Sequence, residues 1–145
     1  MPAGRKQSGK KTAARRAASM FKVAEPTREW SERLTAELRS WPDVGIRPMF
    51  GMLACYRSRT IFAALPAQRT LYSSSAIAFK LQDPPATTLR RLQEDGRILA
   101  SGGIGARWYG FQVDSPEDIR DALLWLGLAY ESAAVGARPG RRKSR

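Results

Sequence analysis

Apolar positions between residues 30 and 41 recur at the period of an α-helix. The intervals are four, four and three residues, and the positions are Trp30, Leu34, Leu38 and Trp41. This spacing places them on one face of a helix that begins near the capping residue Thr27 and ends near Ser40. The sequence therefore predicts an amphipathic helix whose apolar face packs on the rest of the domain.

Between Ile46 and Leu81 the pattern changes to short runs rich in β-branched and aromatic residues. The runs are 47–57, 60–65, 70–74 and 76–81, with short polar spacers between them. Short spacers favour antiparallel hairpins, because a parallel crossover needs a dozen residues or more. A second, shorter helix is then predicted to begin at Thr87 or Thr88 and to end at Gly96.

Two more strands and a long helix complete the pattern. Residues 98–100 and 107–113 read as a hairpin, and in its second strand Tyr109 and Phe111 alternate with more polar positions. Ser115 then precedes Pro116 and two acidic residues, which is the signature of a capped helix start. We expect an α+β domain over residues 24–136, in which helices cover an antiparallel sheet of about five strands in the order α-β-β-β-α-β-β-α.

The net charge of +12 comes entirely from the two ends of the chain. Residues 1–23 hold seven lysines and arginines, residues 137–145 hold five, and neither segment has an acidic residue. We call these segments the N-terminal arm and the C-terminal arm, and their composition predicts disorder. Residues 24–136 hold thirteen basic and thirteen acidic side chains. That balance argues against a large basic face in the fold, although charges can still segregate on its surface.

Histidine is absent and Cys55 is the single cysteine. These counts exclude a disulfide framework, multi-cysteine zinc sites and nucleophile systems that depend on histidine. We therefore predict a protein that is not an enzyme and has no catalytic residue, metal or cofactor. No run of about 18 apolar residues is present. We expect no membrane association and a reducing, cytoplasmic setting.

Particular residues within this order resemble a known family. The stretch Arg47-Pro48-Met49-Phe50-Gly51, the later Tyr56, and Ile61-Phe62-Ala63 resemble the opening strands of the TfoX/Sxy N-terminal domain family. Phe79-Lys80-Leu81 and the closing helix with Trp125, Ala129 and Ala133 are also similar, so the resemblance covers roughly residues 28–134. It implies the same compact fold, a bacterial source and a role in the regulation of competence or transcription. The related YjbR-like group shares this architecture.

Two interpretations of function remain open. In the first, the arms contact nucleic acid through phosphates without reading sequence. The residues that would do so are Lys10, Lys11, Arg15, Arg16, Arg141, Arg142 and Lys143. In the second, the arms are incidental, and a small ligand or a protein partner binds a surface that contains Arg47, Tyr56 and Lys80.

The Arg47–Gly51 stretch also has a purely structural interpretation. In that interpretation Pro48 marks the start of a strand, Phe50 enters the core, and Gly51 permits a bulge or a close approach of strands. Cys55 is expected to be a buried, inert thiol.

Overall fold

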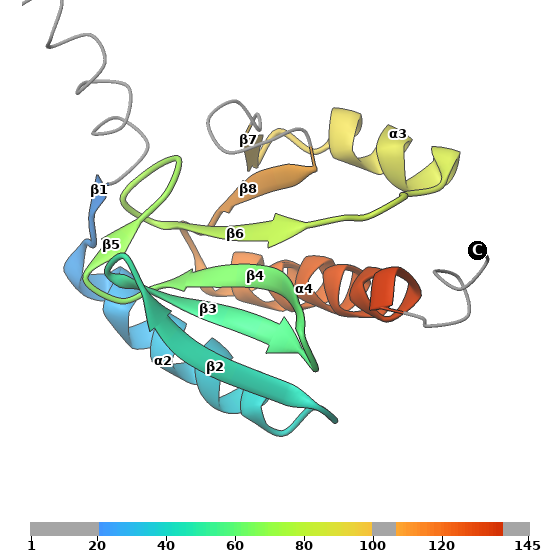
Figure 1. The fold of residues 1–145 in the computed structure, drawn as a ribbon. Helices are drawn as coiled ribbons and strands as arrows, with labels where there is room; N and C mark the ends of the chain where they lie inside the picture. The colour runs from blue at the N-terminus through green and yellow to red at the C-terminus, as the bar shows by residue number, and fades with distance from the viewer. Residues whose placement is uncertain (1–20, 100–106, 138–145) are drawn as a thin grey trace, which may run out of the picture.

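The computed structural model describes residues 21–99 and 107–137. Within these residues, six strands form one antiparallel sheet in the order β2-β3-β4-β6-β8-β7, and β1 pairs with β5 beside it. The elements are β1 (Phe21–Lys22), α2 (Glu25–Arg39), β2 (Val44–Met49), β3 (Met52–Arg57), β4 (Thr60–Pro66), β5 (Arg69–Thr70), β6 (Ala76–Lys80), α3 (Ala86–Glu94), β7 (Ile98–Leu99), β8 (Trp108–Gln112) and α4 (Pro116–Ala137). The predicted α+β fold is confirmed, with six strands in the main sheet where about five were expected (Figure 1).

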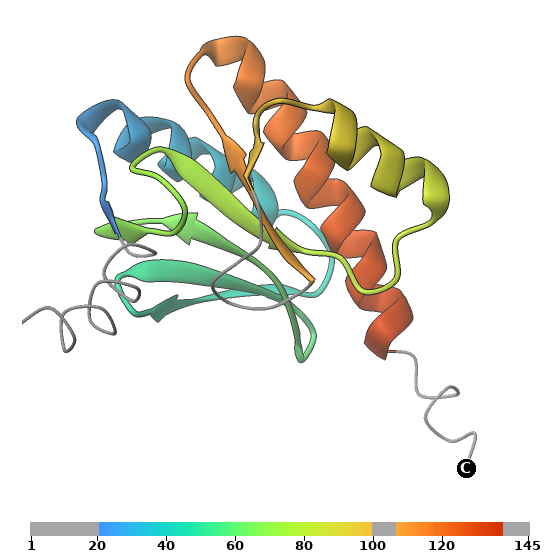
Figure 2. The same cartoon turned by 90° about the horizontal axis from the view of Figure 1, so that it is seen from above.

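All three helices lie on the same side of the sheet (Figure 2). The core lies between these two layers: Leu34 and Leu38 of α2, Leu92 of α3 and Leu126 of α4 pack with sheet residues such as Phe79 and Phe111. The predicted stripe of α2 is therefore confirmed. In the described part of the chain the other side of the sheet carries no helix, and we call it the open face.

Two predicted helix starts have different outcomes. Helix α4 begins at Pro116 directly after Ser115, as the sequence indicated. Helix α2 begins at Glu25, with Ala24 as its N-cap, so the prediction of a cap at Thr27 is wrong. Thr27 is instead buried, and its hydroxyl donates a hydrogen bond to the carbonyl oxygen of Ser74 at 3.2 Å.

The run 47–57 was predicted as one strand and is in fact a hairpin. Strands β2 and β3 pair in register and are joined by Phe50 and Gly51, which have φ of 49° and 82°. Left-handed backbone at a residue other than glycine costs roughly 1–2 kcal/mol, so Phe50 is a poor turn residue and gave no turn signal. Its side chain is 80 % exposed, so the prediction that Phe50 enters the core is wrong.

Three further differences concern strand ends. Pro48 lies inside β2, which is an edge strand, rather than at its start. Of the predicted strand 70–74, only Thr70 pairs, together with the preceding Arg69 in β5. The strand ends there because Tyr72 adopts a φ of 70°. The structure places β1 within residues 1–23, where its Lys22 lies opposite Arg69. The glycine-rich turn of the predicted 98–113 hairpin lies outside the described residues.

Candidate functional site

The open face carries Arg47, Tyr56 and Lys80, the three residues of the α+β domain that the sequence suggested as a surface for a ligand or protein partner. Arg47 lies on β2, Tyr56 on β3 and Lys80 on β6. Alternation along each strand sends every second side chain to the same face. Lys80 thus shares a face with Ala78, which packs in the small cluster that includes Trp108, while Tyr109 and Phe79 face the helices.

Arg47 and Tyr56 are in direct contact on this face. The guanidinium carbon of Arg47 lies 5.3 Å from the centroid of the Tyr56 ring, within the range of a cation–π interaction. The residues opposite them in the ladder are small: Ala54 pairs with Arg47, and Gly45 pairs with Tyr56. These small neighbours leave room for the guanidinium to lie over the ring.

Lys80 is separated from this pair. Strand β6 is two strands away from β3 in the sheet, which corresponds to about 10 Å. The partner of Lys80 in the ladder is the half-buried Trp108 of β8. The open face therefore presents two couples of a cation and an aromatic ring, one towards each edge of the sheet.

The floor between these couples is built from small residues. Ala54, Ala64, Ala78 and Gly110 are successive partners across β3, β4, β6 and β8. Gly110 is required there because a Cβ atom at this position would lie 2.6 Å from the ring of Tyr72. These small residues are buried, and Ala64 and Ala78 pack in one cluster with Met52, Leu71, Tyr72 and Trp108, so larger side chains cover the floor on this face.

The distribution of charge separates the two layers of the fold. None of the thirteen acidic residues lies in a strand. Helices α2, α3 and α4 carry nine of them against six arginines. The described strands carry only cations, namely Lys22, Arg47, Arg57, Arg69 and Lys80.

Most of these strand cations have no acidic partner. Among the described residues, Arg57 alone of the five lies within 4.0 Å of a carboxylate, that of Glu131, and it stacks on the Tyr130 ring on the helix side. The net charge of residues 24–136 is zero, and a sum of this kind does not reveal how the charges are distributed. The open face and the strand ends near it are therefore positively charged, whereas the helix layer carries the acids.

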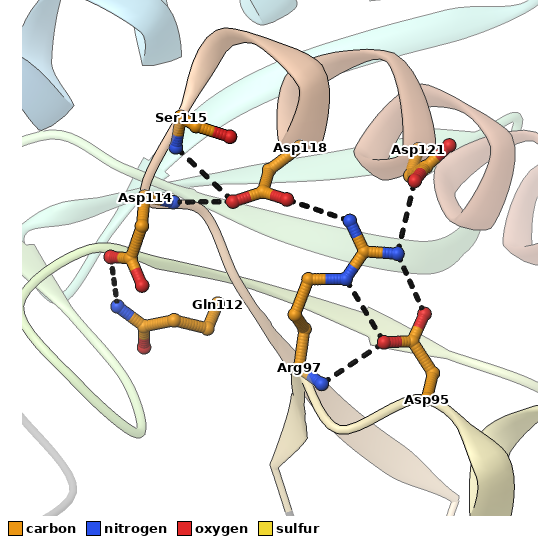
Figure 3. A network of polar contacts seen from close by, with 7 residues as sticks. All are labelled: Asp95, Arg97, Gln112, Asp114, Ser115, Asp118 and Asp121. Carbon is orange, nitrogen blue, oxygen red and sulfur yellow. Dashed lines mark hydrogen bonds and ion pairs between the residues drawn. The ribbon is translucent and has the colours of Figure 1, made fainter.

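A second cluster joins α3, α4 and the start of β7 through Arg97 (Figure 3). The guanidinium of Arg97 donates to Asp95 through Nε at 3.0 Å, to Asp118 through Nη1 at 2.6 Å, and pairs with Asp121 through Nη2 at 3.0 Å. Every cationic hydrogen-bond donor group of this side chain thus faces a carboxylate.

The roles of the carboxylates in this cluster are structural. The second oxygen of Asp118 accepts hydrogen bonds from the backbone N–H groups of Asp114 and Ser115, which is the side-chain half of a capping box at the start of α4. Burial alone would raise the pKa of Asp118, but the hydrogen bonds from the Asp114 backbone and from Arg97 outweigh it and hold the pKa below its usual range. The predicted capped helix start accounts for Asp118, while the contribution of Arg97 and Asp95 gave no signal in the sequence.

Nucleophilic chemistry finds little support among the described residues. Cys55 is fully buried on β3, and burial raises the pKa of its thiol to about 12, so the reactive thiolate is scarce near neutral pH. Burial also raises the pKa of Tyr72 to about 12. No group of three or more acidic or cysteine side chains within residues 21–99 and 107–137 is arranged to hold a metal ion.

The arm residues Lys10, Lys11, Arg15, Arg16, Arg141, Arg142 and Lys143 lie outside the described residues. Of the remaining chain, no helix combines the length and apolar character needed to cross a bilayer. Comparison with known proteins gives no further assignment: no protein-family model, no curated protein and no solved structure matches this chain.

Proposed function

We propose that this protein binds nucleic acid without reading its sequence, through its two basic arms together with the open face of the sheet. The observation that carries the proposal is the segregation of charge: within residues 21–99 and 107–137 the strands hold cations and no acids, and four of the five cations have no carboxylate within 4.0 Å. Such cations displace counterions condensed on a phosphate backbone, which gives binding that weakens as salt rises.

Within each couple on the open face, the cation and the aromatic ring have different parts in this proposal. Arg47 and Lys80 contact phosphates, with the fork of Arg47 suited to a bidentate contact. Tyr56 and Trp108 lie beside them as half-exposed rings, which matches the combination of cations and aromatic rings that single-stranded nucleic acids bind. The arm residues Lys10, Lys11, Arg15, Arg16, Arg141, Arg142 and Lys143 add further phosphate contacts.

A protein partner on the open face is a weaker explanation of the same surface. Interfaces between proteins bury aromatic and other large apolar side chains at their centre. The large apolar side chains that are exposed among the described residues are Phe50, Leu89 and Leu124, in the β2–β3 turn, α3 and α4. None of these three lies over the alanine and glycine floor of the open face, where the larger side chains are the buried Leu71 and the half-buried Tyr72.

The role that we propose for this protein is binding and not catalysis. This role is consistent with the resemblance to the TfoX/Sxy N-terminal domain family, whose implied function is regulation of competence or transcription in bacteria. Supporting observations are the buried thiol of Cys55 and the engagement of Asp95, Asp118 and Asp121 with Arg97.

The test compares the full chain with a variant limited to residues 21–137, which keeps β1. Binding of a labelled oligonucleotide is followed by fluorescence anisotropy as salt is raised. We expect the full chain to bind more tightly, and the shorter chain to keep a weaker, salt-dependent affinity because the sheet cations remain. The proposal is refuted if the full chain binds no nucleic acid at low salt, or if its affinity does not change with salt.

A further inference from the structure

The turn between β2 and β3 presents an aromatic ring where neither backbone preference nor burial favours one. Phe50 adopts a φ of 49°, a left-handed conformation that asparagine, aspartate and glycine accept far more readily. Its side chain is 80 % exposed, the highest value among the exposed large apolar residues described. Folding alone therefore gives no reason for phenylalanine here, and strained residues of this kind cluster at functional sites.

Cations surround this ring. A cleft of about 380 Å³ is lined by Lys22, Val23, Arg28, Phe50, Gly51, Gln68 and Arg69, and we call it the hairpin pocket. It contains three basic side chains and no acidic one. None of the three lies within 4.0 Å of a carboxylate in the described part of the chain.

The backbone holds this pocket in shape. The N–H groups of Gln68 and Arg69 both donate to the carbonyl oxygen of Gly51 at 2.8 Å. The aliphatic stem of Arg69 packs on Gly51, where a Cβ atom would lie only 2.7 Å from Arg69 Cγ. The turn that carries Phe50 is therefore fixed against the strand that carries Arg69.

Two of the cations repel each other in the absence of an anion. Lys22 of β1 lies directly opposite Arg69 of β5 in their antiparallel pair. Like charges in this arrangement are destabilising, and a phosphate between them would convert the repulsion into attraction. Lys22 lies on β1, which Figure 1 labels beside β5, and it also belongs to the N-terminal arm, so the pocket includes a residue of that arm.

We propose that the hairpin pocket binds single-stranded nucleic acid, with one base stacked on Phe50 and the adjacent phosphate held by Lys22, Arg28 and Arg69. The inference rests on the proposed function and adds a preference to it. A single strand offers the faces of its bases for stacking, whereas a duplex hides them between base pairs. The exposed ring therefore favours single strands, while the cations favour any phosphate backbone.

The test uses the full chain and three probes of about 15 nucleotides: labelled oligo(dT), labelled oligo(U), and a labelled DNA duplex. The variants are Phe50→Asn, which suits the left-handed turn, Phe50→Tyr, which keeps the ring, and the control Leu124→Asn. Leu124 is another exposed apolar residue, 54 % exposed, on α4.

We expect Phe50→Asn to lower affinity for single strands by about 5- to 150-fold, to leave duplex affinity unchanged, and to keep or raise the melting temperature. Phe50→Tyr and Leu124→Asn should bind as the unmodified protein does. Comparing the affinity for oligo(dT) with that for oligo(U) shows whether DNA or RNA is the preferred single strand.

Equal single-strand affinity of Phe50→Asn and the unmodified protein would overturn the inference, as would equal losses on single strands and duplex. In both cases the proposed function survives, because the unmodified protein still binds nucleic acid. If the unmodified full chain binds none of the three probes, the proposed function and the inference fall together.

Discussion

Replacing Arg47 and Lys80 together by glutamine tests whether the open face contacts phosphates. Both side chains lie on strands of the main sheet, and neither has a carboxylate within 4.0 Å among the described residues. Glutamine keeps the length of each side chain in part and removes its charge. The double variant should fold normally, since its changes leave no acidic partner unpaired and touch no core residue.

The size of the effect follows from counterion release. Each phosphate contact on a single strand adds about −0.7 to the slope of log affinity against log salt, so losing two contacts makes the slope shallower by about 1.4. Between about 50 and 200 mM salt, this difference changes the affinity ratio of the two proteins by about 7-fold. Anisotropy titrations of a labelled oligonucleotide at four or five salt concentrations resolve a change of this size.

A matched control separates the position of the charges from their number. The double variant Arg90→Gln and Arg120→Gln loses the same charge from exposed positions on α3 and α4, in the layer that carries the acids. We expect its slope to differ little from that of the unmodified protein. The same slope for all three proteins would refute the proposal that the open face binds phosphates and would leave binding to the arms and the hairpin pocket.

Three further predictions concern the stability of the fold. Arg97→Met, which leaves Asp118 without its cationic partner, should lower the free energy of unfolding in urea by about 1–2 kcal/mol at neutral pH. Because the folded-state pKa of Asp118 is depressed, the unmodified protein should lose this stability as pH falls below about 4, so equal acid sensitivity of both proteins would contradict the network. Gly110→Ala should destabilise by about 1–3 kcal/mol through its clash with Tyr72, and Tyr72→Ala in the same chain should recover part of the loss. A thiol reagent at pH 8 should modify Cys55 only as fast as the protein unfolds, since the thiol is fully buried and burial also raises its pKa to about 12; rapid labelling of folded protein would show that the thiol is accessible.

The parts of the fold that could be predicted are those with a strong periodic signal. The α2 stripe of Trp30, Leu34 and Leu38 and the alternation around Phe111 identified which faces are buried, and both are confirmed. The Ser115-Pro116 pair identified the start of α4 because capping depends on a few adjacent residues. Such local features need no knowledge of the tertiary contacts.

The β2–β3 turn was missed because its residues contradict local preference. A two-residue turn is normally signalled by asparagine or glycine, and Phe50 gives the opposite indication. The turn is stabilised by contacts that are distant in sequence, namely the hydrogen bonds from Gln68 and Arg69 to Gly51. The hairpin pocket could therefore not be predicted from the sequence, because it depends on contacts between residues that are distant in the chain.

The sequence grouped Arg47 with Tyr56 but did not indicate how the two side chains are arranged. Arg47 and Tyr56 were grouped by a resemblance in sequence, and the sheet register then explains their contact through Ala54 and Gly45. The segregation of charge could not be read from the composition, because the sum over residues 24–136 is zero wherever the charges lie. The Arg97 cluster was missed for a similar reason, since its carboxylates come from two helix ends.

Two ordinary effects could also produce a sheet without acids, and Lys80 distinguishes them from a binding role. Low β-propensity keeps aspartate and glutamate out of strands, but it also disfavours lysine, and two of the strand cations are the lysines Lys22 and Lys80. Protection of exposed sheet edges favours cations and accounts for Arg47 on the edge strand β2. Lys80 is the last residue of β6, which lies between β4 and β8 and is not an edge strand. A cation on this inner strand, opposite Trp108 and with no acidic partner within 4.0 Å among the described residues, fits the proposal that an anion binds the open face.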